Sequence, residues 1–238
     1  MTNRRIEAGD RFSLWEWADH MLSQSSNAAG STVWKQAMLI RRFGARYPPS
    51  KEDEAAFFKS TPKAELWKLS IDVLEAPLKA AGLDTTRLRL GTFFTRNASS
   101  VVPGSASYAC PNELLRSLVK MEQGKLVDAW TSLELKRLLY FVRPRYRYAA
   151  SPALNSAAVF FKSGSLFECV AEPGYTCVQY KGNKVNLMHS VAVVESGAKT
   201  YLVAMMSNVL RVKSAVEHQT IAGEIEKLIQ GRPGAKAE

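Results

Sequence analysis

The stretch Ala157-Ala158-Val159-Phe160-Phe161-Lys162-Ser163-Gly164-Ser165 carries most of the information about the fold. Its first part is a short apolar run rich in Val and Phe, a pattern typical of a β-strand over Ala157–Phe161. Lys162-Ser163-Gly164-Ser165 follows, and by itself this tetrapeptide is more typical of an ordinary turn than of a functional site. The stretch therefore predicts a strand that ends in a lysine, two hydroxyl groups and a glycine.

The chain after this stretch is predicted to continue the sheet. Short apolar or alternating runs, separated by turn residues, predict four further strands, at Phe167–Val170, Thr176–Tyr180, Leu187–Val194 and Thr200–Met206. Because these strands follow one another with short connections, we expect them to pair antiparallel. From Ala215 to Ile229 apolar residues recur at helical spacing and predict a closing helix.

The first half of the chain is predicted to be helical, because its apolar residues recur at steps of three and four. The predicted helices are Phe12–Leu22, Ala28–Phe43, Lys51–Lys59, Pro62–Ala80, Pro111–Glu122 and Ser132–Phe141, with a long irregular connection over residues 84–108. Helices followed by consecutive strands and a closing helix indicate the α+β class. We therefore expect one domain over residues 1–238, with a helical lobe (12–156), a part with strands and the closing helix (157–230) and a tail (231–238).

Ser25-Ser26-Asn27 lies in the polar break between the first two predicted helices. Serine and asparagine are common at helix boundaries, where their side chains cap free backbone N–H groups. Taken alone, the triplet is therefore better explained by capping than by catalysis.

The triplet and the strand-end motif together resemble the Ser-Asp-Asn and Lys-Thr-Gly elements of the penicillin-recognising serine hydrolases, the superfamily of class A β-lactamases and D-Ala-D-Ala peptidases. Cys110-Pro111-Asn112-Glu113-Leu114 is similar to the Thr-Pro-x-x-Leu helix of that family, and Tyr201-Leu202-Val203-Ala204-Met205-Met206-Ser207-Asn208 is similar to its last strand. The resemblance extends from about Phe12 to Ile229. It implies a β-lactamase/transpeptidase-like fold whose N-terminal part is missing from this chain.

The resemblance implies a reaction and three catalytic residues. In the family, a serine attacks a lactam, amide or ester carbonyl and forms an acyl-enzyme that water hydrolyses. Ser25 would relay a proton to the leaving nitrogen, and Lys162 would keep the proton affinity of that hydroxyl low. The Ser165 N–H would form half of the oxyanion hole.

The expected substrate is a small molecule or peptide with a carboxylate. By resemblance, Asn27 would bond its side-chain amide, Ser163 would donate to the carboxylate, and Gly164 would let the strand approach the substrate. Arg145 is a further candidate, because Arg143, Arg145 and Arg147 alternate along a segment that we expect to be extended, and arginine binds carboxylates with two N–H groups. The alternative is an exposed basic edge that discourages strand pairing.

Some positions depart from the family pattern. Ser26 replaces the Asp of Ser-Asp-Asn, and Ser163 replaces the Thr of Lys-Thr-Gly, which preserves a hydroxyl donor. No Ser-x-x-Lys precedes Ser25, although the family nucleophile belongs to such a motif upstream. Ser117-Leu118-Val119-Lys120 comes after the triplet, so we treat it as a coincidental match.

Because of this gap we expect a truncated serine hydrolase, inactive in this form. A natural ligand-binding relative that has lost its catalytic front end is the alternative. The family's deacylating carboxylate is not recognisable either, since neither Glu54 nor Glu65 stands in a Glu-x-x-x-Asn pattern. This favours a peptidase or esterase over a β-lactamase.

Composition leaves a second class of function open. The formal net charge is +10, and aromatics alternate with arginines near Tyr146, as in some nucleic-acid-binding proteins. The charges are mostly dispersed, so we expect a solvated basic surface and no nucleic-acid partner. His20, His189 and His218 show no metal-ligand spacing, and no metal or cofactor is expected. We expect neither a membrane span nor a signal peptide in this chain, and the oligomeric state is left open.

Cys169 and Cys177 lie four residues to either side of Pro173, next to Gly174. A hairpin that turns there would place them on facing strands, where a disulfide is feasible. Two reduced cysteines packed in a sheet are equally compatible with the sequence. A disulfide would imply an oxidising compartment, and the resemblance implies a periplasmic or extracellular location for the full-length protein.

Overall fold

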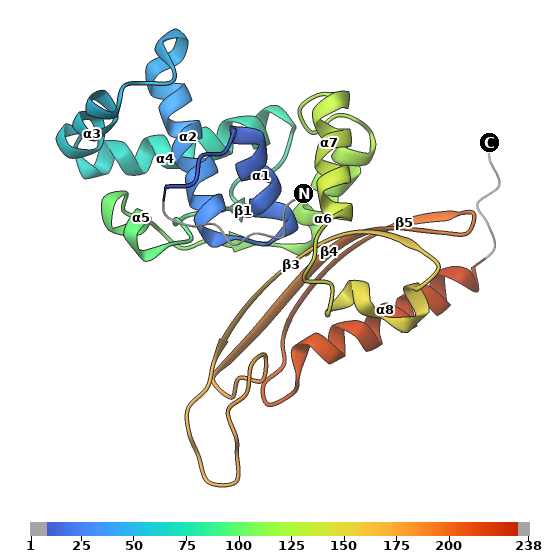
Figure 1. Cartoon of the computed structure of the whole chain (residues 1–238). Helices are drawn as coiled ribbons and strands as arrows, with labels where there is room; N and C mark the ends of the chain where they lie inside the picture. The colour runs from blue at the N-terminus through green and yellow to red at the C-terminus, as the bar shows by residue number, and fades with distance from the viewer. Residues whose placement is uncertain (1–8, 233–238) are drawn as a thin grey trace. The chain divides into compact units, whose positions relative to one another are not determined.

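A computed structural model describes residues 9–232 of the chain. These residues form two compact units (Figure 1). Unit 1 contains the residues up to Leu74 together with Gly91–Ala106, and unit 2 contains Glu75–Leu90 and the residues from Ser107 on. The predicted helical lobe of residues 12–156 is thus divided between the two units.

Unit 1 is helical. Its elements are α1 (Leu14–Ser23), α2 (Asn27–Phe43), a 3-10 turn (Gly44–Arg46), α3 (Lys51–Ser60), most of α4 (Lys63–Ala80) and α5 (Arg96–Val101). Trp34 of α2 lies at its centre, because the indole ring stacks on Phe93 at 4.3 Å between centroids and its Nε1 donates to the Ser70 carbonyl at 2.8 Å. This packing joins the loop after Gly91 to α2 and α4.

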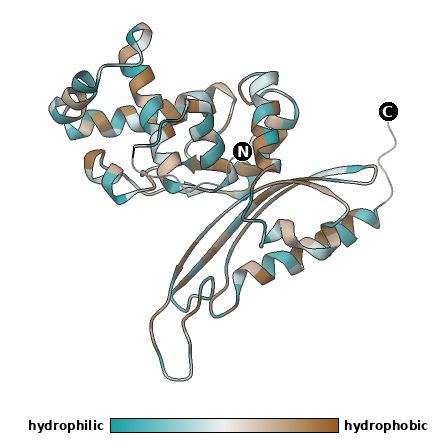
Figure 2. Ribbon diagram, viewed as in Figure 1, coloured by the Kyte–Doolittle hydropathy of each residue, from teal (hydrophilic) through white to brown (hydrophobic). Residues whose placement is uncertain are grey.

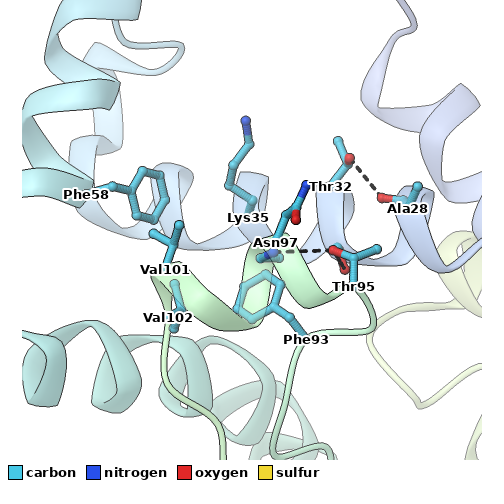
Figure 3. A pocket seen from close by; sticks show the side chains of 11 residues that line it. Ala28, Thr32, Lys35, Phe58, Phe93, Thr95, Asn97, Val101 and Val102 are labelled. Carbon is cyan, nitrogen blue, oxygen red and sulfur yellow. Dashed lines mark hydrogen bonds between the residues drawn. The ribbon is translucent and has the colours of Figure 1, made fainter. Parts of the chain in front are cut away.

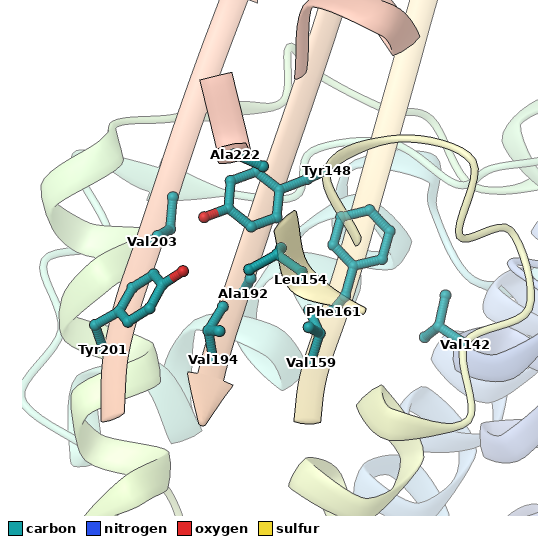
Figure 4. Packing of buried hydrophobic residues seen from close by; sticks show 10 residues of the cluster. All are labelled: Val142, Tyr148, Leu154, Val159, Phe161, Ala192, Val194, Tyr201, Val203 and Ala222. Carbon is teal, nitrogen blue, oxygen red and sulfur yellow. The ribbon is translucent and has the colours of Figure 1, made fainter. Parts of the chain in front are cut away.

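Unit 2 is built on an antiparallel sheet with the strand order β3-β4-β5. The strands are β3 (Ala158–Glu168), β4 (Val185–Ser196) and β5 (Lys199–Asn208), and α8 (Ser214–Gln230) runs along one face of them (Figure 1). Phe161, Ala192 and Val203 form one row across the three strands and are buried with Ala222 of α8 (Figure 4). The main core of unit 2 therefore lies between the sheet and α8.

The other face of the sheet is covered by α6 (Pro111–Glu122) and α7 (Ala129–Tyr140). Lys136 of α7 forms ion pairs with Glu122 of α6 and Glu195 of β4, and its ammonium lies 4.5 Å from the centroid of Phe160. Burial alone would lower the pKa of Lys136, but the two carboxylates raise it above its ordinary value. The smaller elements of unit 2 are the pair β1 (Leu88–Arg89) and β2 (Tyr108–Ala109), and the 3-10 turns Tyr148–Ala150 and Pro152–Leu154.

The α+β class is confirmed, and five predictions about elements need correction. Lys162-Ser163-Gly164-Ser165 lies inside β3 and forms no turn, because β3 pairs with β4 without interruption up to Glu168. The predicted strand Phe167–Val170 is the end of β3, and Thr176–Tyr180 is no strand but part of an irregular connection with two isolated bridges. The connection over residues 84–108 contains β1, α5 and the first residue of β2, and the helix expected at Ser132 begins at Ala129 after the capping residue Asp128.

Cys169 and Cys177, in the irregular connection between β3 and β4, form a disulfide with 5.8 Å between their Cα atoms. Of the two alternatives compatible with the sequence, the oxidised pair is therefore the one that the structure contains.

Hydrophobic residues colour much of β3, β4 and β5, whereas α8 alternates between hydrophilic and hydrophobic stretches, as expected of a helix with one face on a sheet (Figure 2). None of the helices in residues 9–232 is long and apolar enough to cross a membrane.

Candidate functional site

Lys162 and Ser163 leave β3 on opposite faces of the sheet, because side chains alternate along a strand. Phe160 packs on the α6–α7 side of the sheet and Phe161 on the α8 side. Lys162 therefore lies on the same side as Phe160, and Ser163 on the same side as Phe161. From Gly164 to Glu168 the strand is exposed, and a Cβ atom at Gly164 would meet no atom within 4 Å. The end of β3 thus offers hydroxyl groups and an open backbone to a ligand.

Arg147 lies against the hydroxyl groups of β3. Its Nη1 donates to Ser163 Oγ at 2.5 Å, and its Nη2 donates to Ser165 Oγ at 3.0 Å and Tyr146 Oη at 3.4 Å. Only 6% of Arg147 is exposed, and its Nε has no hydrogen-bond partner among the described residues. None of the ion pairs formed by residues 9–232 includes Arg147. Burying a cation without a carboxylate partner costs free energy of folding, unless an anionic ligand supplies the missing negative charge.

Lys162 is held in an environment that disfavours its charge. Burial, together with the positive charge of Arg147, lowers the pKa of Lys162 from its ordinary value of 10.5 to about 8. Its Nζ donates to the Ser163 carbonyl at 2.7 Å. A lysine that titrates near neutral pH is suited to proton transfer.

Arg145 does not lie at these hydroxyl groups. Its Nη1 donates to the Tyr140 carbonyl at 3.2 Å and its Nη2 to the Val159 carbonyl at 3.0 Å, so the guanidinium joins the end of α7 to β3. A role of Arg145 in substrate binding stays a prediction. In this segment, Arg147 is the arginine next to Ser163 and Ser165.

The triplet Ser25-Ser26-Asn27 belongs to unit 1, whereas the β3 residues belong to unit 2. Ser26 caps α2, since its Oγ accepts from the Ala29 N–H at 3.2 Å, and Asn27 is the first helical residue. Ser25 has a φ of 56°, a left-handed conformation that is uncommon for a residue other than glycine. The capping explanation therefore holds for Ser26, while the unusual backbone at Ser25 is of the kind found at functional sites.

One turn further along α2, Ser31 fixes the loop that follows Gly91. Its Oγ accepts from the Phe94 N–H at 3.2 Å and from the Thr95 hydroxyl at 3.3 Å. A Cβ atom at Gly30 would come within 2.8 Å of the Phe94 ring, so the glycine permits this close approach. Residues 90–112 contain no Asp or Glu, and this loop therefore brings no carboxylate to α2. The two glutamates considered from the sequence as deacylating carboxylates are placed elsewhere: Glu54 is paired with Lys35, and Glu65 lies exposed on α4.

Unit 1 also contains a cavity of about 500 Å³. Figure 3 shows it between α2, α5 and the adjoining loop, with Phe58, Phe93 and Val101 among its apolar lining and Lys35 and Asn97 among its polar groups. None of the residues predicted for the catalytic site lines it. Its composition is that of a mostly apolar pocket, and no feature of it selects a particular ligand.

The sequence has three Ser-x-x-Lys stretches, which begin at Ser60, Ser117 and Ser196. In each, the serine hydroxyl is used for structure: Ser60 donates to the Ala56 carbonyl, Ser117 to the Leu114 carbonyl and Ser196 to the Glu226 carboxylate. Sequence reasoning considered only the second of them. In none of the three does a hydrogen bond join the serine hydroxyl to the lysine ammonium of its own motif, as expected of coincidental matches.

No family model and no curated protein matches the sequence. Solved structures do match: a β-lactamase from Sphaerobacter thermophilus aligns with a TM-score of 0.61 at 12% identity, over 96% of this chain and 68% of that chain. A mutant of PBP-A, solved as an acyl-enzyme complex with penicillin G, aligns with a TM-score of 0.57 at 14% identity, over 97% and 66%. An ancestral class A β-lactamase aligns with a TM-score of 0.56 at 15% identity, over 93% and 66%.

The chain has the fold of class A β-lactamases and PBP-A. The fold expected from the two motifs is thereby confirmed. The chain spans about two thirds of the length of these neighbours, 64% in the case of PBP-A. At such low identity the likeness establishes the fold alone.

The sequence analysis selected Arg145, and not Arg147, as the candidate for binding a carboxylate. The alternation of the three arginines could not separate them, because the segment forms no strand and Arg147 directly precedes a 3-10 turn. No local signal in the sequence singles out Arg147, because Arg145 and Arg147 both neighbour Tyr146, and the second ring that Arg147 contacts belongs to Tyr180, 33 residues further along the chain.

Proposed function

We propose that the chain binds a small acyl compound with a free carboxylate at the exposed end of β3, as the substrate-binding part of a serine hydrolase of the β-lactamase and penicillin-binding type. The observation that carries this proposal is the buried guanidinium of Arg147 beside two serine hydroxyls, without an acidic partner among the described residues.

A carboxylate is the ligand group that best suits this site. Guanidinium and carboxylate form paired, charge-assisted hydrogen bonds, and the hydroxyls of Ser163 and Ser165 can turn their protons toward the same anion. The ligand would neutralise a charge that the fold has already removed from water, so little desolvation of the protein remains to oppose binding.

The remaining roles follow the family pattern. Ser25 would relay a proton, Lys162 would lower the proton affinity of that hydroxyl, and Asn27 would bond the acyl side chain of the substrate. The Ser165 N–H would contribute to an oxyanion hole, which suits an edge strand, where every second N–H is left out of the ladder. These roles require a nucleophile of the Ser-x-x-Lys type.

The loop after Gly91 bears on the fate of an acyl-enzyme. Hydrolysis of such an ester needs a base that activates water. Because residues 90–112 contain no carboxylate, we propose that a protein combining this chain with such a nucleophile would deacylate slowly, as in a peptidase or an acyl-accumulating enzyme, rather than turn over β-lactams rapidly. The disulfide Cys169–Cys177 supports a place of action in an oxidising compartment such as the periplasm or the extracellular space.

Calorimetric titration with penicillin G tests the proposal. We expect the wild-type chain to bind it, and Arg147→Ala to bind it about 10-fold or more weakly, because a hydrogen bond to a charged group contributes about 1.5–3 kcal/mol. Arg143→Ala is the matched control: it removes the same charge from the same segment at an exposed position and should change the Kd less than about 3-fold.

The ligand provides a second control. The methyl ester of penicillin G lacks the free carboxylate and should bind the wild type about as weakly as penicillin G binds the Arg147→Ala variant. Absence of binding at about 10 mM penicillin G, equivalent to a binding free energy weaker than about 3 kcal/mol, would contradict the proposal. Equal affinities for acid and ester would contradict it as well.

A further inference from the structure

The connection between β3 and β4 is a long arm, residues 169–184, at the end of the sheet (Figure 1, orange). The disulfide Cys169–Cys177 closes the first half of this arm, from the residue directly after β3 onward. At its base, Asn183 forms two hydrogen bonds with the backbone of Val170, one to the N–H and one to the carbonyl, both at 2.8 Å. These bonds fix the place where the arm rejoins the sheet, and Tyr180 lies in the part of the arm that leads back to β4.

The backbone of Tyr180 is held in an unusual conformation. Its φ is 62°, in the left-handed region that bulky residues rarely adopt and that persists only where the surroundings impose it. Its carbonyl accepts from both the N–H and the hydroxyl of Ser214, the buried first residue of α8, at 3.0 and 3.2 Å. The start of α8 thus holds the backbone of Tyr180 in place.

The ring of Tyr180 faces the segment before β3. It stacks on Tyr146 with 5.8 Å between centroids and an interplanar angle of 29°, and the two hydroxyl oxygens lie 2.7 Å apart. Phe167 of β3 packs its ring against Tyr180 at 5.9 Å. Gln219 of α8 donates to the Tyr146 carbonyl at 2.8 Å, so α8 fixes the backbone of both tyrosines.

Arg147 lies against both rings. Its Cζ is 4.9 Å from the centroid of Tyr180 and 5.2 Å from that of Tyr146. Attraction between a cation and an aromatic face is strongest where water is excluded, as it is around this buried guanidinium. The rings stabilise the charge and leave the N–H groups directed at the hydroxyls of Ser163 and Ser165.

From this arrangement we infer that Tyr180 is a positioning residue: its ring, presented by the arm, holds Arg147 in the orientation that binds a substrate carboxylate. The inference deepens the proposed function and rests on it. It assigns the arm a purpose in ligand binding, carried out through Arg147 and without contact between Tyr180 and the substrate.

The central variant is Tyr180→Asn, because asparagine tolerates the left-handed backbone and removes only the ring. We expect it to raise the Kd for penicillin G by about 10-fold, the scale of a buried cation–π contact. Tyr180→Phe keeps the ring and should stay within about 3-fold of wild type. Tyr175→Leu is the control on the arm, since Tyr175 contacts Lys181 and Arg211 but not Arg147.

A second measurement needs no ligand. The Arg147 Nε–H signal in a proton–nitrogen NMR spectrum, assigned by its loss in Arg147→Lys, should be sharp in wild type and Tyr180→Phe. It should broaden or shift toward free guanidinium in Tyr180→Asn. If Tyr180→Asn does not fold, Tyr146→Leu removes the opposite ring and should give the same two effects.

The outcomes separate the two proposals. Failure of wild type to bind penicillin G would reject the proposed function, while the NMR signal would still decide whether the ring orients Arg147. Binding that depends on Arg147 but is unchanged in Tyr180→Asn, with an unchanged signal, would overturn the inference. Equal losses in Tyr180→Asn and Tyr175→Leu would also overturn it, because the arm as a whole, and not the ring, would then hold Arg147.

Discussion

Lys162 shows how the fold can bury a charged side chain at the expense of stability. The fold buries its ammonium and places the charge of Arg147 nearby, and both effects lower its pKa to about 8. In the unfolded chain the same group titrates near 10.5. Below pH 8 the folded protein therefore carries a charge that it would hold more easily when unfolded.

We predict that Lys162→Met raises the thermal midpoint at pH 7 by about 3 °C or more, which corresponds to about 1 kcal/mol in a chain of this size. Between pH 8 and 10.5 the unfolded state binds more protons at this position than the folded state, so wild-type stability should rise with pH through this window. The advantage of the variant should therefore shrink by pH 10. Scanning calorimetry at both pH values, with the exposed Lys125→Met as control, measures the effect; an advantage independent of pH would contradict this account.

At the scale of elements, α8 is bonded to the sheet near both of its ends. Near its start, the two ring nitrogens of His218 each lie 2.9 Å from a serine hydroxyl, Ser190 on β4 and Ser207 on β5. Near its end, Glu226 accepts from Ser196 and Tyr201 at 2.7 and 2.6 Å. Because α8 also fixes Tyr146 and Tyr180, these buried bonds contribute to the geometry around Arg147 as well as to stability.

Substitution of Glu226 tests how much the bonds between α8 and the sheet contribute to stability. Burial opposes ionisation of its carboxyl group, but the hydrogen bonds from Tyr201, Ser196 and Gln230 outweigh it and keep the pKa of Glu226 below its ordinary value. We predict that Glu226→Ala lowers the free energy of unfolding at pH 7 by about 2 kcal/mol, because it leaves the Tyr201 hydroxyl buried without its acceptor. Urea unfolding measures the loss.

Glu224→Ala, an exposed position on the same helix, is the control and should change stability by less than about 0.5 kcal/mol. The contribution of Glu226 is present above the pKa of an unfolded glutamate, about 4.5, and is lost as pH falls through its lower folded value. The difference between wild type and Glu226→Ala should therefore narrow below pH 4.5. A difference that grows on acidification would show that the carboxylate is not the stabilising form.

At the scale of the whole molecule, we expect the chain to bind a ligand but not to react covalently with it. The residues of the proposed carboxylate site on β3 lie within unit 2, whereas Ser25 and Asn27 lie in unit 1. Each serine of the three Ser-x-x-Lys stretches donates to a carbonyl or carboxylate, and Lys63 and Lys199 donate to backbone carbonyls. No such pair is arranged as a nucleophile and its base.

We therefore predict that the chain binds penicillin G without forming a covalent adduct. Intact-mass spectrometry after prolonged incubation should show the unmodified mass, with a class A β-lactamase or PBP-A as the positive control. A stable adduct would contradict the prediction, and peptide mapping would then identify the nucleophile.

The sequence by itself determined the fold class and most elements. Helical spacing located Pro111–Glu122 correctly, and a Val- and Phe-rich run located the first strand of the sheet, because both patterns reflect local periodicity. It also placed Cys169 and Cys177 opposite each other, since a Pro-Gly turn between them sets their separation. The two motifs, taken with their order and with the similar segments around them, predicted the fold that the solved structures confirm.

Only the tertiary structure decided which arginine lies at the hydroxyl groups of β3 and what holds it there. Arg145 and Arg147 look equivalent in an alternating sequence, but their segment is irregular, and irregular backbone has no period from which side-chain directions follow. Tyr180 seemed to be a strand residue, yet contacts with Tyr146 and Ser214, each 34 residues away in the chain, fix it in a left-handed turn. Such distant pairings depend on how α8 and the arm pack together, and no local pattern records them.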